Sequence, residues 1–323
     1  MSDELKKGLE GVLVAESGLS LIDGDEGRLV YRGYTIEDLA RGASYEEVLY
    51  LLWNGELPTE SELDAFASDM AAERAVDDDV LGTVRDLADA DEVPMSAVRT
   101  AVSELSAFDP DATEDVDPTD REANLAKGKR LTAKLPTIVA AFTRLREGEE
   151  PVAPREDLSH AANFLYMLNG EEPDDVMEDV FDQALVLHAD HGLNASTFSA
   201  MVTASTLADL HSAITSAIGT LSGSLHGGAN QNVMEMLKEV DDSGKDPIEW
   251  VEAALDDGRR VAGFGHRVYN VKDPRAKILS EQSEELGEAA GDTKWYEMSV
   301  AIEEYMQSEK GLAPNVDFYS ASD

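Results

Sequence analysis

The sequence of 323 residues contains no cysteine. This absence excludes disulfide bonds, zinc sites built from thiolates, and thiol nucleophiles. Long apolar runs are also missing: the most apolar stretch, residues 135–142, contains a proline and is far shorter than the roughly 18 residues of a membrane span. The first residues carry acids where a signal peptide needs a basic start and an apolar core. We therefore expect a cytoplasmic protein with no membrane segment.

Positive charge is scarce as well. The chain has 26 basic and 67 acidic residues, a formal net charge of -41. So large a negative excess repels nucleic acid and anionic membranes and excludes both as general partners. Disorder is excluded by the apolar content of 42%, which is typical of a globular protein.

The cations consist of 11 lysines and 15 arginines, which indicates a surface depleted of lysine and saturated with carboxylates. Such a surface repels itself unless salt screens it, and at molar salt the Debye length is only about 3 Å. We therefore expect a halophilic protein that works in a salt-rich cytoplasm.

Two kinds of local pattern predict a mostly helical fold. Residues 19–34 contain two β-prone runs around a glycine-rich turn, which predicts one short N-terminal hairpin. Most of the remaining chain has helical periodicity, as in residues 295–306. Residues 246–258 show both helix ends: Asp246 can cap, Gly258 stops the helix, and the apolar stripe between them is Ile248, Val251 and Leu255.

Two further segments differ from the rest in composition. Residues 198–225 are rich in small side chains, which allow close approach in a helical core or in a contact between subunits. Residues 109–120 carry six acids and superficially suggest a calcium loop, but they lack its turn glycine and contain two prolines. We interpret the second segment as a solvated acidic loop.

Basic residues gather in two windows of the sequence. An acidic protein that binds an anion needs such local concentrations of positive charge. Residues 259–277 hold six cations and a single acid, and residues 123–146 hold six cations and no acid. The first window also contains a histidine in a glycine-rich loop, which favours a ligand site. For the second, ordinary contacts of an exposed helix are the simpler interpretation.

Two of the six histidines lie in glycine-rich loops. His226 and His266 both follow or precede glycines, which let the backbone approach a ligand closely. His188 and His191 are three residues apart and could share a helix face, but no carboxylate pattern or thiolate completes a metal site. The other two histidines have no such setting and are expected to be hydrogen-bonded core residues; they are His160 and His211.

Asp317 is an acid between apolar neighbours in a chain whose acids mostly lie in polar runs. Burial there raises a carboxyl pKa towards that of a useful general base. Two histidines, one such base and an arginine that holds a carboxylate suit proton abstraction next to a carbonyl, followed by carbon–carbon bond formation.

At these residues the sequence resembles citrate synthase in its archaeal and bacterial short form. The matching motifs occur one after another in order from about residue 10 to the end of the chain; they are Leu21-Ile-Asp-Gly-Asp-Glu-Gly, Tyr31-Arg-Gly-Tyr, Ala133-Lys-Leu-Pro-Thr-Ile-Val, Asn163-Phe-Leu-Tyr-Met, Leu187-His-Ala-Asp-His, Asn194-Ala-Ser-Thr-Phe, Leu225-His-Gly-Gly-Ala-Asn, Gly263-Phe-Gly-His-Arg-Val-Tyr, Asp273-Pro-Arg and Pro314-Asn-Val-Asp.

The resemblance implies an all-α, two-domain citrate synthase fold and a homodimer. The large domain would comprise residues 1–226, the smaller mobile domain residues 227–323. It also implies that the family continues beyond Asp323 with helices and arginines of the large domain, so that we expect this chain to lack that part and, alone, to turn over poorly.

The resemblance further implies an enzyme that condenses acetyl-CoA with oxaloacetate and water to give citrate and CoA. Asp317 would be the base that enolises the acetyl group, with help from His226 and His266. His191 and Arg275 would bind oxaloacetate, and Ser196 would orient His226; these catalytic, substrate-binding and orienting residues are His191, Ser196, His226, His266, Arg275 and Asp317.

Coenzyme A is expected at the loop that begins at residue 261. On the resemblance, Val261, Gly263, Phe264 and Gly265 line the adenine pocket, and Arg267 or Lys272 bind CoA phosphates. Acetyl-CoA is then a co-substrate, with no permanently bound cofactor and no metal.

Three alternatives stay open. A 2-methylcitrate synthase would share these residues and take propionyl-CoA, which differs from acetyl-CoA by one methylene. A non-catalytic homologue would only bind acyl-CoA, although the intact candidate residues argue against it. A hydrolase with a histidine-bound metal is the most distant.

Overall fold

The computed structural model describes residues 14–112, 116–223, 226–266 and 268–322. Within these ranges the chain forms fifteen α-helices, one short 3-10 helix and one three-stranded sheet near the N-terminus. The prediction of an all-α fold with a small β element is confirmed. None of the helices in these ranges combines the length and the apolar character needed to cross a membrane.

The elements in chain order are β1 (Ser20–Asp23), β2 (Arg28–Tyr31), β3 (Tyr34–Thr35), α1 (Ile36–Gly42), α2 (Tyr45–Asn54), α3 (Glu60–Ala72), α4 (Asp78–Asp89), α5 (Pro94–Leu105), η2 (Ser106–Phe108), α6 (Arg121–Arg146), α7 (His160–Asn169), α8 (Asp175–His188), α9 (Ala195–Ala204), α10 (Leu210–Leu221), α11 (Ala229–Ser243), α12 (Pro247–Asp256), α13 (Pro274–Ala290), α14 (Lys294–Lys310) and α15 (Val316–Ser320).

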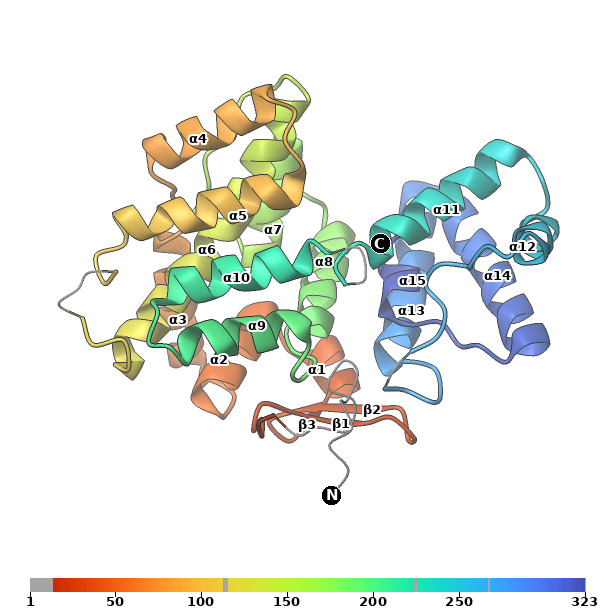
Figure 1. Cartoon of the computed structure of the whole chain (residues 1–323), viewed down its shortest axis with the longest axis horizontal. Coiled ribbons are helices and arrows are strands. Elements are labelled where there is room, and N and C mark those ends of the chain that lie inside the picture. Colours follow the sequence, from red (N-terminus) through yellow and green to blue (C-terminus); the bar gives the residue numbers. More distant parts are fainter. Residues whose placement is uncertain (1–13, 113–115, 224–225, 267, 323) are drawn as a thin grey trace, which may run out of the picture.

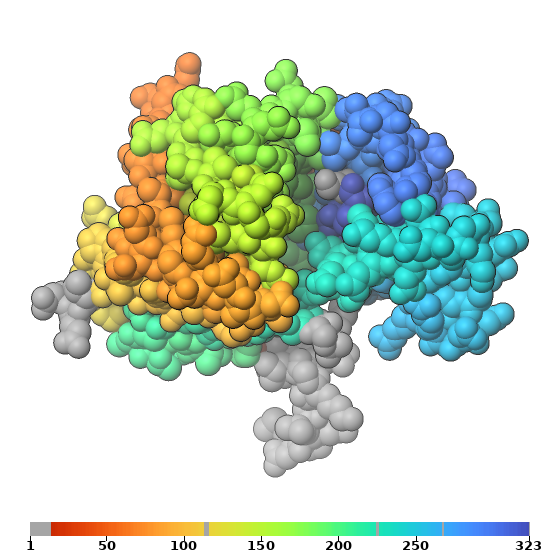
Figure 2. Space-filling view, turned by 90° about the horizontal axis from the view of Figure 1, so that it is seen from above, coloured from red at the N-terminus to blue at the C-terminus, as the bar shows by residue number. Residues whose placement is uncertain are grey.

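The helices form two groups (Figure 1). The large lobe contains α1 to α10 with the sheet beneath them, and the small lobe contains α11 to α15. The chain passes from one to the other between α10 and α11. Figure 2 looks onto the seam where the green surface of the large lobe meets the blue surface of the small lobe. The domain boundary after residue 226 stays a prediction.

The N-terminal sheet confirms the predicted hairpin and adds a strand. β1 pairs antiparallel with β2, with Ser20 opposite Tyr31 and Asp23 opposite Arg28. The turn between them is closed by the Asp23 carboxylate, which accepts the backbone N–H groups of residues 25 and 26 at 3.1 Å each. β3 then pairs with β2, a strand too short to be read from the sequence.

One apolar core runs through both lobes. Its buried side chains include Tyr31 and Leu187 from the large lobe and Leu279 and Phe318 from the small lobe. A second core lies inside the large lobe between α4, α5, α6 and α10. Because the first core crosses the seam, α8 packs directly against α13, which in turn packs against the C-terminal helix α15.

The two helices predicted in most detail are present. α14 buries Met298, Ile302 and Met306, as the periodicity predicted. In α12 the Asp246 carboxylate accepts the backbone N–H of Ile248 at 2.9 Å and Val251 is fully buried. The prediction is wrong for Ile248 itself, which is 36% exposed; the residue that the first turn of α12 buries is Trp250.

The small-residue segment folds into α9 and α10, which pack against each other. The hydroxyl groups of Ser199 and Ser216 are 2.6 Å apart across this contact, which only small side chains permit. The outer side of α9 is open, with Val202 51% exposed, and Leu207 in the connection to α10 is 61% exposed.

The Tyr31 hydroxyl ties the hairpin to the end of α8. It is fully buried and donates to the carbonyl oxygen of Asp190 at 2.7 Å. We expect Tyr31→Phe to lower the free energy of unfolding by about 1–3 kcal/mol, because the Asp190 carbonyl loses its buried donor. Urea unfolding in molar KCl measures this. Tyr34→Phe, at a position 40% exposed, is the matched control and should leave stability unchanged.

Candidate active site

Three aromatic rings from both sides of the seam meet in one cluster. His191 follows α8 in the large lobe, whereas His266 and Tyr269 belong to the loop before α13 in the small lobe. The His191 and His266 ring centroids are 5.7 Å apart, and those of His266 and Tyr269 are 4.8 Å apart. The Tyr269 hydroxyl lies 3.2 Å from Nε2 of His191. The fold thus brings together two of the predicted site histidines and one tyrosine.

His266 is held by the backbone of its own loop. The N–H groups of Val268 and Tyr269 donate to its Nδ1 at 2.9 and 3.1 Å. Since Nδ1 accepts, the ring proton of the neutral imidazole is on Nε2. Burial lowers the pKa of His266, with Asp273 acting in the opposite direction, so the ring is neutral near pH 7. The result is a neutral imidazole with one N–H directed away from its loop.

A buried ion pair stands next to this imidazole. Asp273 caps α13 and accepts hydrogen bonds from the backbone N, Nε and Nη2 of Arg275, at 2.9, 3.1 and 2.8 Å. The Asp273 side chain is fully buried and Arg275 is only 4% exposed. Oδ2 of Asp273 lies 3.7 Å from Nε2 of His266. Arg275 therefore carries a fixed positive charge beside the cluster, with one edge of its guanidinium held by Asp273.

His191 is also neutral. Burial, assisted by the charge of Arg275, lowers the pKa of His191 to about 4. Its position depends on the preceding residue, because the Asp190 carbonyl is bound by the Tyr31 hydroxyl and the Asp190 carboxylate accepts the N–H of Gly192 at 3.0 Å. A neutral histidine beside an arginine can donate to a carboxylate without competing for its charge.

Asp317 lies in the first turn of the short helix α15. Asn315 caps this helix and accepts the Asp317 N–H at 3.0 Å. Burial raises the pKa of Asp317; the nearby His188 and Arg275 act in the opposite direction. The half-buried carboxyl is therefore a stronger base than an exposed aspartate, within electrostatic reach of the cluster.

The predicted CoA loop is attached to the same helix. Asn315 donates from its backbone N to the carbonyl of Gly263 at 2.9 Å and from its amide to the carbonyl of Gly265 at 3.1 Å. The rings of Phe264 and Phe318 pack with centroids 4.5 Å apart. A side chain at Gly263 would collide with Phe318 at 2.7 Å, and φ there is +80°, so both space and backbone require glycine. The loop and Asp317 form one unit.

His226 lies at the crossing between the lobes. Its Nε2 is 2.8 Å from the hydroxyl of Ser196, and α11 begins three residues later at Ala229. The contacts of the described residues do not join His226 to His266 or Asp317. The structure thus pairs His226 with its predicted orienting residue, whereas its place in one site with the other two stays a prediction.

Lys272 is engaged inside the small lobe. Its ammonium lies 2.6 Å from Oε1 of Glu303, a buried carboxylate that also accepts the hydroxyl of Tyr319. Its assignment to CoA phosphates stays a prediction. Arg267, the other predicted phosphate ligand, lies outside the described residues.

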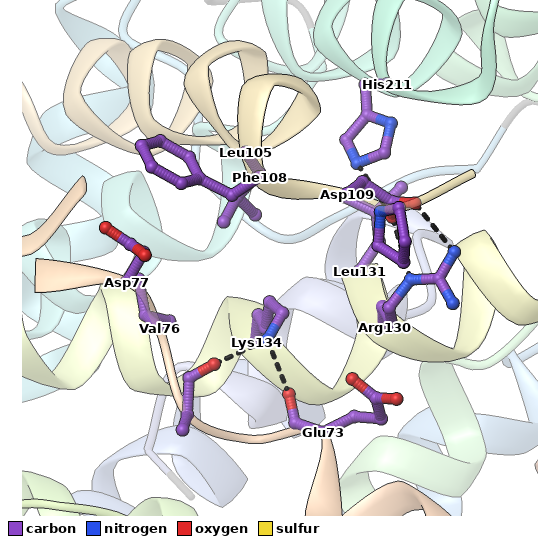
Figure 3. Close-up of a pocket in the computed structure, with 12 residues that line it drawn as sticks. Glu73, Val76, Asp77, Leu105, Phe108, Asp109, Arg130, Leu131, Lys134 and His211 are labelled. Atoms are coloured by element: carbon purple, nitrogen blue, oxygen red, sulfur yellow. Dashed lines mark hydrogen bonds and ion pairs between the residues drawn. The ribbon is translucent and has the colours of Figure 1, made fainter. Parts of the chain in front are cut away.

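The second basic window serves the large lobe. Figure 3 shows Lys134 directed to the backbone carbonyl of Glu73, at 3.0 Å, and Arg130 directed to Asp109. Nη2 of Arg130 is 2.7 Å from Asp109 and 2.6 Å from Asp111, so two residues of the acidic segment form ion pairs with this arginine. Glu73, Asp109, Arg130 and Lys134 line a cavity of about 330 Å³ in the large lobe. The contacts favour the structural interpretation of residues 123–146.

The remaining histidines differ from one another. His160 and His211 are 5% and 2% exposed, which confirms that both lie in the core, whereas the predicted hydrogen bonding is wrong for Nδ1 of His211, which has no hydrogen-bond partner among the described residues. Nδ1 of His188 donates to the carbonyl of Ala184 at 2.7 Å, and the ring lies within electrostatic reach of Asp317. The sequence pattern presents His188 only as a potential metal ligand, and its proximity to Asp317 is not visible in it.

Sequence reasoning gave no role to Tyr269 and Asp273. Both belong to motifs of the family resemblance in which the roles were assigned to other residues. These motifs are Gly263-Phe-Gly-His-Arg-Val-Tyr and Asp273-Pro-Arg. An available signal was the single acid within the first basic window, since a lone carboxylate among six cations is expected to pair.

The chain matches known proteins over nearly its whole length. The family model described as "Citrate synthase, C-terminal domain" matches residues 8–322. A citrate synthase from Haloferax volcanii is 73% identical over 323 residues, which cover 100% of this chain and 85% of that protein.

Two solved structures have the same fold. The citrate synthase of Pyrobaculum aerophilum superimposes with a TM-score of 0.90 at 42% identity, over 98% of this chain and 80% of that one. A ternary complex of carboxymethyl coenzyme A and oxaloacetate with the citrate synthase of Thermoplasma acidophilum superimposes with a TM-score of 0.88 at 33% identity, over 99% and 84%. The chain therefore belongs to the citrate synthase family.

Proposed function

We propose that the protein condenses acetyl-CoA with oxaloacetate and water, giving citrate and CoA. The observation that carries this proposal is the cluster of neutral His266 and His191 with the buried Asp273–Arg275 pair, within electrostatic reach of the half-buried base Asp317. A base, neutral hydrogen-bond donors and a fixed positive charge are what enolisation and attack on a keto acid require.

The first step takes a proton from the acetyl methyl group to the carboxylate of Asp317. The negative charge that develops on the thioester oxygen needs a donor, and His226 is assigned to it. A donated hydrogen bond from the Ser196 hydroxyl to Nε2 of His226, 2.8 Å away, leaves the ring proton on Nδ1 for that oxygen. Ser196 is thus a positioning residue.

In the second step the enol carbon attacks the keto carbon of oxaloacetate. The Nε2–H of His266 donates to the keto oxygen as the new bond forms and charge moves onto that oxygen. His191 and Arg275 bind the carboxylates of oxaloacetate, the latter through a guanidinium whose fork shape suits a carboxylate. Water then cleaves the thioester of citryl-CoA and releases citrate and CoA.

The loop of Val261, Gly263, Phe264 and Gly265 is assigned to the adenine of CoA. Its attachment to α15 through Asn315 supports this, because a nucleotide bound there is held by the same unit that carries Asp317. Acetyl-CoA is a co-substrate, and no permanently bound cofactor is assigned.

The two lobes are proposed to be the domains of residues 1–226 and 227–323. His191 comes from one and His266 and Asp317 from the other, so a small rotation of the lobes changes the distance between substrate ligands. Closure would also keep the enol and the thioester from bulk water until the new bond has formed.

The decisive assay is thiol release from acetyl-CoA in the presence of oxaloacetate. We expect slow release by the unaltered chain and a further fall in kcat of about 10²–10⁴-fold for Asp317→Asn, because the amide cannot accept the methyl proton. Oxaloacetate binding, measured by calorimetry, should persist. Asp242→Asn, an exposed position on α11, is the matched control.

Two outcomes of this assay would contradict the proposal. A higher kcat/KM with propionyl-CoA than with acetyl-CoA would make the protein a 2-methylcitrate synthase. Binding of acyl-CoA without any thiol release would make it a non-catalytic homologue.

The pH dependence of kcat/KM depends on the two shifted groups. Burial raises the pKa of Asp317, so activity should rise with pH through a value above the ordinary aspartate value of about 4. Burial lowers the pKa of His266, so this ring is neutral near pH 7 and adds no loss of activity from there up to pH 8. An acid limb that falls at or below pH 4, with the fold intact by circular dichroism, would remove Asp317 as the buried base.

We also propose that the active form is a homodimer. The support is the open side of α9 and the exposed Val202 and Leu207, next to helices rich in small residues. Small side chains let helices of two subunits approach closely, and apolar groups exposed on one face gain stability when a second copy covers them.

The protein is further proposed to be halophilic and cytoplasmic. A net charge of -41 destabilises a compact chain through self-repulsion unless salt screens it. The same screening is needed before two such chains can associate.

Light scattering and circular dichroism across a KCl series test both proposals together. We expect twice the mass of 35.0 kDa and full helicity in molar KCl, with loss of the dimer and of helicity as salt is removed. Val202→Asp should dissociate the dimer in molar KCl and leave the helices intact. A monomer at every salt concentration would contradict the dimer, and a fold that is indifferent to salt would contradict halophily.

A further inference from the structure

We infer that the turn between β1 and β2 positions His266, and that Gly24 is the residue in this turn on which the position depends. The inference rests on the proposed function only where it states that a misplaced His266 imidazole lowers kcat. The structural coupling stands on its own contacts. Gly24 and His266 are separated by most of the chain and by the seam between the lobes.

The turn is hydrogen-bonded to the loop that comes after His266. The carbonyl oxygen of Gly24 accepts the backbone N–H of Asn270 at 2.9 Å. The amide of Asn270 donates to the Asp25 carboxylate at 2.6 Å. Two adjacent residues of the turn thus hold one residue of the loop by its main chain and its side chain, which fixes both its position and its orientation.

The contact leaves no room for a side chain at Gly24. A Cβ there would lie 1.9 Å from the carbonyl oxygen of Val268 and 2.8 Å from its carbonyl carbon. Gly24 is not among the residues with positive φ, so alanine is compatible with its backbone conformation and close approach is the constraint. The obstructing atoms are main-chain atoms, which move only if the loop moves.

Val268 is also a residue that holds the imidazole. Its N–H donates to Nδ1 of His266 at 2.9 Å, and the N–H of Tyr269 donates at 3.1 Å. These two donors keep the proton on Nε2, on the side of His191 and Asp273. A shift of the Val268 peptide therefore changes both the place of the ring and the nitrogen that carries its proton.

A second glycine of the turn touches the same loop. A Cβ at Gly27 would lie 2.7 Å from Cγ2 of Val271, and φ there is +63°. The turn therefore lies along residues 268–271 and meets them at more than one point. Val268 and Val271 are each 44% exposed, so burial of their side chains contributes little to holding this loop in place. Tyr269 between them is buried in the histidine cluster, so the loop is held from inside at Tyr269 and from outside by the turn.

Gly24→Ala tests the inference. We expect kcat to fall about tenfold or more, since small displacements of a catalytic group have such effects. Loss of the two donors to Nδ1 makes protonation of His266 easier, so the acid limb of kcat/KM should move to higher pH. The titratable and charged groups that face this ring are His191, Tyr269, Asp273, Arg275 and Asp317, and their effects on its pKa must stay constant.

Gly42→Ala is the matched control. This glycine ends α1, also in the large lobe, and a Cβ there meets nothing within 4 Å. The control should keep the kcat and the pH profile of the unaltered protein. Both variants are compared by thermal unfolding in molar KCl, so that a loss of activity is not mistaken for a loss of fold.

An exchange of side chains across the contact gives a second route. Asn270→Asp places two carboxylates together and should lower kcat in the same direction as Gly24→Ala. Adding Asp25→Asn restores one amide and one carboxylate in reversed order and should recover kcat. Recovery by the double variant is not expected if residue 270 only contributes to general stability.

The ring nitrogens of His266 provide a readout without turnover. With ¹⁵N-labelled histidine, the unaltered protein should show Nδ1 as acceptor and Nε2 protonated, and Gly24→Ala should shift or mix these signals. Unchanged signals, kcat and pH profile in Gly24→Ala would overturn the inference. An unaltered protein that releases no thiol would refute the proposed function instead, and the nitrogen signals would still decide the coupling.

Discussion

The buried pair of Asp273 and Arg275 is the interaction on which the site depends. One carboxylate caps α13, holds one edge of the arginine and lies beside His266. Two charges buried together are costly to desolvate, and the multiple hydrogen bonds to Asp273 offset that cost. Removing either partner would leave the other charge buried and alone. The pair therefore fixes where positive charge stands at the seam, and the neutral histidines are arranged around it.

Charge has opposite roles at the surface and at this pair. The surface carries the excess of acids that gives -41, whereas the site keeps a guanidinium in a protected position. Much of the other positive charge in the two basic windows is consumed by ordinary contacts, such as Lys134 with backbone carbonyls and Lys272 with Glu303. A local count of cations therefore overstates the number available to an anionic substrate. Burial and pairing decide which of them can act.

The sequence predicted the fold class, the N-terminal hairpin and the ends of α12 because these depend on local periodicity and capping. It also singled out His226, His266 and Asp317 by their unusual neighbours. It gave no role to Asp273 or Tyr269. A lone acid among cations indicates an ion pair but not which cation it binds, and a single tyrosine in the same basic window does not differ locally from a structural residue. Ile248 was misplaced because periodicity identifies a face and not how much of that face is covered.

The sequence by itself determined that this is an acidic, cysteine-free, helical chain with its chemistry in a few glycine-rich loops. Only the tertiary structure decided that His191 meets His266, that Arg275 is bound by Asp273, and that Gly24 lies against Val268. The reason is physical. Composition and capping act over one or a few turns of chain, whereas these contacts depend on the folded backbone. The contacts of His191 and Gly24 join residues that are far apart in sequence. Such residues meet only once a shared core has brought the two lobes together.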